Sequence, residues 1–199
     1  MTVELPEWLL KNQVEIIGAL LGVSYVILSV RQSILTWPAG ILTSAFYIFV
    51  FLKSGFYAYM GLQVYYVLIS LYGWYFWMKG NRKDEKRQSS VGRLNFRSGM
   101  ILLVFTSLIF VLIHFMLNKF TDSRIPVTDS ILTAFSITAT WLLARKILEN
   151  WLLWIMVDAV SAIVFSVKGM WPTSVLYFIY TVLAVSGFLK WKKSMIRNG

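Results

Sequence analysis

The chain has 199 residues, of which 58% are hydrophobic and 14% charged, and its mean hydropathy is +0.67. This leaves too little polar surface to cover a soluble globule of that length, so the composition indicates an integral membrane protein. The net charge of +10 does not predict nucleic-acid binding, because the basic residues lie in the short gaps between apolar runs. The absence of cysteine excludes disulfides and thiolate metal sites.

Apolar runs predict seven membrane-spanning helices. They cover residues 12–30, 37–52, 56–78, 98–117, 128–144, 149–167 and 170–189, close to the roughly 20 residues that cross a hydrocarbon core of about 30 Å. Pro38 and Pro172 fall near the first turn of their runs, where the missing N–H costs nothing. We therefore expect an all-α integral membrane protein, with residues 1–199 forming a single transmembrane domain.

An internal repeat organises these spans. Residues 31–79 recur without a gap, 114 positions later, at 145–193, so that Trp37 matches Trp151 and Gly73 matches Gly187. The repeats are residues 12–79 and 128–193, separated by a linker and fourth span at 80–117. Because one span separates two triplets, both triplets cross the membrane in the same direction, which predicts a parallel 3+1+3 arrangement. The polar stretch 80–97 lacks apolar periodicity and is expected to be a solvated linker.

The basic residues predict the orientation. With the N-terminus outside, the inside gaps hold 14 Lys and Arg residues and the outside gaps hold five. The positive-inside rule therefore favours an N-out, C-in topology.

The sixth span carries the strongest candidate for chemistry. Asp158 lies near its centre, where an ionised carboxylate costs about 2.5–3.5 kcal/mol, and its repeat counterpart is Ser44. Asn150, Trp154 and Asp158 recur at intervals of four and share one stripe, suited to a cationic heteroaromatic ligand. The structural alternatives are a hydrogen bond or an interhelical ion pair for Asp158, a helix cap for Asn150, and an interfacial aromatic belt for Trp151 and Trp154. The belt is the preferred interpretation for Trp151.

Other spans offer polar and aromatic side chains that would complete a cavity. Single hydroxyls in membrane helices often serve packing alone, so only the set together suggests a small-ligand site. The candidates are Gln63, Tyr66 and Trp74 in the third span, Thr133 and Ser136 in the fifth, and Tyr177 and Tyr180 in the seventh.

The sequence lacks the residues and motifs that several other functions require. His114 is the only histidine, so histidine-based metal sites and catalytic triads are not expected, and no cofactor is predicted. No nucleotide-binding P-loop motif occurs, and a single mid-membrane carboxylate does not make a proton relay.

Two stretches resemble signatures of the Pnu family of vitamin transporters. They are Glu149–Trp154, followed by Asp158, and Gln63–Tyr66 running on to Gly73–Trp77. The resemblance extends from about Glu15 to Lys193. It implies the seven-span fold related in shape to the SWEET sugar transporters, facilitated diffusion with trapping of the vitamin by phosphorylation in the cytoplasm, and a homo-oligomer that would be a trimer.

The residues that open the second span indicate which vitamin is carried. Its opening, Trp37–Gly40, looks more like the thiamine-carrying branch than the nicotinamide riboside branch, so thiamine is favoured, and both vitamins are cations with a flat heteroaromatic ring. A membrane-embedded enzyme is the main alternative, but it would need a second ionisable group beside Asp158. A receptor or assembly subunit is the third.

Overall fold

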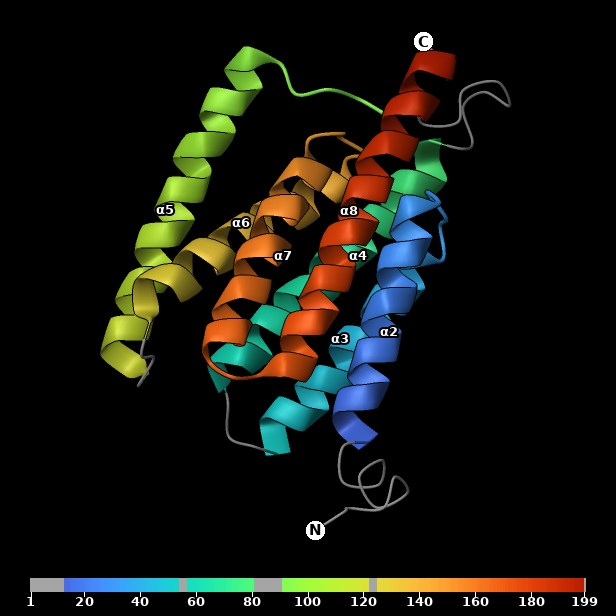
Figure 1. Cartoon of the computed structure of the whole chain (residues 1–199). Helices are drawn as coiled ribbons and strands as arrows, with labels where there is room; N and C mark the ends of the chain where they lie inside the picture. The colour runs from blue at the N-terminus through green and yellow to red at the C-terminus, as the bar shows by residue number, and fades with distance from the viewer. Residues whose placement is uncertain (1–12, 54–56, 81–90, 122–124, 199) are drawn as a thin grey trace. The chain divides into compact units, whose positions relative to one another are not determined.

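The computed structural model describes residues 13–53, 57–80, 91–121 and 125–198 (Figure 1). Within these ranges the chain forms seven α-helices, with one isolated β-bridge and no strand. The helices are α2 (Gln13–Val30), α3 (Thr36–Lys53), α4 (Tyr57–Gly80), α5 (Phe96–Phe120), α6 (Pro126–Ala144), α7 (Asn150–Val167) and α8 (Trp171–Asn198).

Each predicted apolar run corresponds to one helix. Six of the seven are long and apolar enough to cross a membrane; the exception is α4, which carries many tyrosines and Gln63. Most helix ends lie within one residue of the predicted ones, and four others differ by two or three residues. The last helix differs most, because α8 continues to Asn198 rather than ending at residue 189. Trp191 is fully buried, so packing carries this helix beyond its apolar stretch.

The described helices fall into two compact units, residues 1–75 and 76–199. In the first unit, α3 packs on α2 and glycines let aromatic side chains approach a neighbouring backbone. The ring of Trp37, which is fully buried, lies where a Cβ at Gly73 would have to be. The Tyr47 hydroxyl occupies the corresponding space at Gly18. These close approaches require glycine and fix the helix positions within this unit.

In the second unit, α5 packs on α6, α6 on α7, and α7 on α8 (Figure 1). A buried hydrogen bond of 2.8 Å between the Thr106 and Thr138 hydroxyls joins α5 to α6. The core at one end consists of tryptophans: Trp191 lies 5.5 Å from Trp151 and 6.2 Å from Trp77, measured between ring centroids.

Trp151 was expected in an interfacial belt, and this prediction is wrong. Its side chain is 2% exposed. A Cβ at Gly187 would come within 2.6 Å of its ring, so the indole packs directly on the α8 backbone. The residue is a core contact of the α7–α8 pair.

The turns that join α2 to α3 and α6 to α7 have the same backbone structure. Gln32 (φ 55°) and Lys146 (φ 53°) both adopt the left-handed conformation. The Ser33 N–H donates to Leu28 O at 3.0 Å, and the Ile147 N–H donates to Leu142 O at 3.0 Å. These are the bonds of a Schellman motif, which usually places glycine at the left-handed position. The two turns therefore follow the 114-residue repeat in structure as well as in sequence.

The linker before α5 departs from its prediction. Residues 81–90 lie outside the described part of the chain, but Val91 is buried. The Gly92 N–H donates to Lys146 O, and the Leu148 N–H donates to Gly92 O, both at 3.0 Å. A short parallel bridge thus attaches the end of the linker to the α6–α7 turn. The expectation of a purely solvated stretch is wrong for these residues.

Candidate functional site

The stripe predicted on α7 lies on one helix, and its last residue, Asp158, is midway along α7. The carboxylate-bearing side chain is 6% exposed. Two ring contacts align α7 with α8: Phe165 stacks on Tyr177, and Trp151 contacts Trp191. Asp158 is midway between the two α7 residues and Ala184 is midway between the two α8 residues. Asp158 therefore lies at the same level as Ala184. Ala184 is 1% exposed.

No basic side chain neutralises Asp158 within the described parts of the chain, where the ion pair found joins Arg93 to Glu149. A buried carboxylate without a cation is costly in a membrane. An ion pair within the described residues therefore does not explain Asp158, whereas a cationic ligand would supply the missing positive charge.

Asn150 begins α7 and is fully buried. Its Nδ2 donates to Ile147 O at 2.6 Å, within the left-handed turn. Among the described residues its Oδ1 has no hydrogen-bond partner. Glu149 occupies the N-cap position, and no side chain caps the helix, so the alternative that Asn150 is a cap is wrong. The amide nitrogen thus secures the turn, while the buried amide oxygen has no partner among the described residues.

Trp154 lies one turn further along α7 and is half-buried. Its indole is partly exposed, whereas the indole of Trp151 is enclosed by protein.

The hydroxyls predicted on α6 are committed to their own helix. Thr133 Oγ1 donates to Asp129 O at 2.7 Å, and Ser136 Oγ donates to Leu132 O at 2.8 Å. Such bonds satisfy a hydroxyl in a membrane helix and leave its lone pairs as acceptors.

The tyrosines predicted on α8 form an aromatic group with α7. Tyr177 stacks on Phe165 with centroids 5.3 Å apart, and Tyr180 meets Tyr177 edge-on at 5.8 Å. This group lies between the α7–α8 connection and the level of Asp158. The structure thus places the tyrosines and the carboxylate on one pair of neighbouring helices.

The remaining predicted residues belong to the first compact unit. Gln63, Tyr66 and Trp74 are all half-buried on α4. Tyr66 contacts Tyr65 in a tilted arrangement with centroids 5.5 Å apart.

Sequence reasoning did not predict the contacts made by residues near the start of α7. Glu149 accepts a hydrogen bond from the Leu94 N–H at 3.0 Å and pairs with Arg93 at 3.4 Å. The Lys146 ammonium lies over the Trp77 ring at 4.5 Å, while Trp77 Nε1 donates to Ala144 O at 3.1 Å. The available signal was the repeat match between Trp77 and Trp191.

Comparison with known proteins gives the family. The model of the nicotinamide mononucleotide transporter family matches residues 12–193. The chain belongs to this family. The Pnu family predicted from the sequence is thereby confirmed, and so is the prediction that the protein is not an enzyme.

The chain is similar to the nicotinamide riboside transporter PnuC of Escherichia coli, at 23% identity over 94% of this chain and 87% of the relative. It is also similar to the riboflavin/roseoflavin transporter RibM of Streptomyces davaonensis, at 25% identity over 89% and 83%. A solved structure, the crystal structure of the vitamin B3 transporter PnuC, superimposes with a TM-score of 0.75 at 21% identity, covering 94% of this chain and 84% of that one. The protein is therefore a multi-pass bacterial membrane transporter with a PnuC-like fold.

Proposed function

We propose that this protein carries a cationic heteroaromatic vitamin, thiamine in preference to nicotinamide riboside, across the bacterial cytoplasmic membrane. The observation that carries the proposal is Asp158, buried on α7 without a basic partner among the described residues. A vitamin cation would neutralise it, and the half-buried Trp154 would stack on the ring.

The proposed site extends along the helices described above. Asn150 Oδ1 would accept a hydrogen bond from the ligand, and the tyrosines Tyr177 and Tyr180 would form an aromatic wall. Thr133 and Ser136 would offer acceptor lone pairs, and Gln63, Tyr66 and Trp74 are proposed as further contacts from α4. Together they would give the mainly aromatic lining with few polar points that is usual in small-molecule sites.

The preference for thiamine rests on the Trp37–Gly40 segment. In the structure Trp37 packs against Gly73 and Gly40 packs against Ser70 and Tyr25. This segment would therefore act by setting the position of α3, and not by touching the ligand.

The proposed transport mode is facilitated diffusion with trapping in the cytoplasm. The protein would work as a single transmembrane domain of seven spans in a parallel 3+1+3 repeat of the SWEET type, N-out and C-in, and as a trimer. The matching Schellman turns support the repeat. Vesicle uptake driven by neither ATP nor a proton gradient is the expected behaviour.

The proposal is tested by titrating the purified protein with thiamine, nicotinamide riboside and riboflavin while following tryptophan fluorescence. We expect quenching that saturates at the lowest concentration with thiamine, next with nicotinamide riboside, and last with the uncharged riboflavin. Tightest binding by riboflavin would contradict the assignment of a cation, and no binding of any vitamin would favour a receptor or assembly subunit.

A further inference from the structure

The last turns of α8 carry an open face that the transport site does not use. It is formed by Leu189, Lys192, Lys193, Ile196 and Arg197. Their spacing of three and four residues puts them on one face of the helix. Trp191, on another face, is fully buried against Trp151. Packing therefore occupies the opposite side of α8 and leaves this face open.

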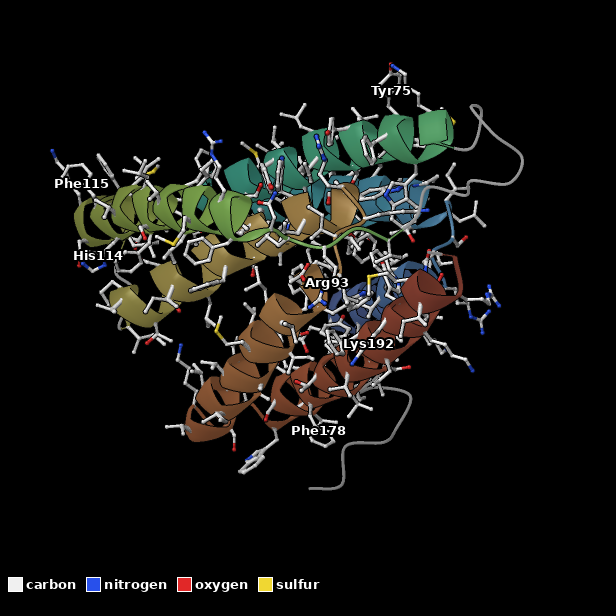
Figure 2. All side chains as sticks on the ribbon, turned by 90° about the horizontal axis from the view of Figure 1, so that it is seen from above. Tyr75, Arg93, His114, Phe115, Phe178 and Lys192 are labelled. Carbon is white, nitrogen blue, oxygen red and sulfur yellow. The ribbon has the colours of Figure 1, made fainter. Side chains whose placement is uncertain are left out.

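The charge of this face has one sign. Three cationic side chains lie on the face, and α8 contains no acidic residue along its whole length. The α6–α7 turn and the start of α5 lie at the same end of the second unit (Figure 1). Glu149, in that turn, is already bonded to Arg93 and the Leu94 N–H. Figure 2 shows the Lys192 side chain on α8. The face therefore attracts an anion.

The same face is also apolar. Leu189 is 60% exposed and Ile196 is 71% exposed, one turn to either side of the lysines. Two large aliphatic side chains therefore flank the cations on this face. A free phosphate would use the cations and leave the aliphatic surface uncovered. The combination suits a ligand with an anionic head and an apolar tail.

We propose that this face is a binding site for an anionic phospholipid. Its phosphate pairs with Lys192, Lys193 and Arg197, and one acyl chain lies along Leu189 and Ile196. The long basic side chains place their stems along the acyl chain and their charges at the headgroup. The site is separate from Asp158 and independent of which vitamin is carried.

The experiment is native mass spectrometry of the detergent-purified full chain, titrated with phosphatidylglycerol or phosphatidylcholine. The test variant is Lys192→Gln/Lys193→Gln/Arg197→Gln. The control, Lys53→Gln/Lys119→Gln/Lys168→Gln, removes the same charge from the ends of three other helices. Each basic residue at a membrane surface is worth about a fivefold change in affinity, so we expect a loss of about a hundredfold for phosphatidylglycerol in the test variant. The control is expected to bind as the parent does.

Two further measurements separate the sources of the anion. Leu189→Ser/Ile196→Ser keeps every charge and should still weaken phosphatidylglycerol binding severalfold. Inorganic phosphate at matched concentration should not displace the lipid. Equal binding of phosphatidylcholine by the parent, or equal losses in the test and control variants, would overturn the proposal. Displacement by phosphate together with unchanged binding in the serine variant would assign the face to small anions instead.

Discussion

The indole ring of Trp151 on α7 lies directly against Gly187 on α8, and the same contact joins Trp37 to Gly73 in the other repeat. In both pairs the glycine follows the tryptophan by 36 positions, and both tryptophans are buried. The glycines leave the space that the rings fill. In each repeat, one aromatic ring packed on a bare backbone thus fixes the second helix against the third.

Gly187→Ala should destabilise the protein by about 1–3 kcal/mol, because the added methyl overlaps the Trp151 ring and an overpacked core costs that much. The measurement is the thermal unfolding midpoint in detergent, which should fall by several degrees. Gly61→Ala is the matched control, since nothing lies within 4 Å of a Cβ there. Its midpoint should stay level or rise, and an equal fall in both variants would contradict the packing argument.

Gln32→Gly should stabilise the protein by up to about 1 kcal/mol, because a left-handed backbone costs a non-glycine residue about 1–2 kcal/mol, offset in part by the greater freedom of glycine when unfolded. Lys146→Gly relieves the same strain but also removes the ammonium from the Trp77 ring. Its unfolding midpoint should therefore lie below that of Gln32→Gly. The reverse order would show that the Lys146 contact contributes nothing.

Trp154→Ala should weaken vitamin binding by about 1–2 kcal/mol, the value of a desolvated cation over an indole face. The measurement is isothermal titration calorimetry with thiamine. Trp171→Ala, which removes an indole that is 64% exposed at the start of α8, is the control and should bind normally. Unchanged affinity in folded Trp154→Ala would remove this residue from the site.

Asp158→Asn separates charge from shape, because the amide keeps the size of the side chain and most of its hydrogen bonding. Affinity for thiamine should fall strongly, while affinity for a neutral ring analogue of thiamine should change much less. A parallel loss for both ligands would mean that Asp158 acts structurally. Parental affinity for both would eliminate the counter-charge role altogether.

Lys146 should make stability depend on alkaline pH. Burial lowers the pKa of its ammonium from 10.5 to about 8 in the folded protein. Between those pH values the unfolded chain holds a proton that the folded chain has released, so stability rises with pH across this window. Unfolding midpoints of Lys146→Met, compared with the parent from pH 7 to 11, should lack this rise. Lys168→Met, at an exposed lysine, should keep it.

The sequence was sufficient for the spans, because the length of each helix is set by membrane thickness and appears as an apolar run. It also predicted the stripe of Asn150, Trp154 and Asp158, since residues four apart share a helix face whatever surrounds the helix. The position of Trp151 could not be read in this way. An indole near a helix end has the same local pattern at a lipid interface as in a core, and only the distant Gly187 distinguishes them.

The attachment of Gly92 to the α6–α7 turn could not be predicted from the sequence for a different reason. Its two hydrogen bonds use main-chain atoms alone, so they leave no side-chain pattern to recognise. The arrangement of the candidate site also depends on which stripe of one helix faces its neighbour. That choice is made by contacts such as Phe165 on Tyr177, which join residues on different helices and leave no local pattern in the sequence.

The matched turns at Gln32 and Lys146 have a consequence for how such a chain diverges after duplication. The turns keep their hydrogen bonds and their left-handed residue while the side chains differ, amide in one and ammonium in the other. Thr36 and Asn150, and Ser44 and Asp158, differ in the same way, and all four are buried. Because the same backbone hydrogen bonds form in both turns, selection can change polarity and charge in one copy without disturbing the other, and an asymmetric ligand can be fitted by altering half of the molecule.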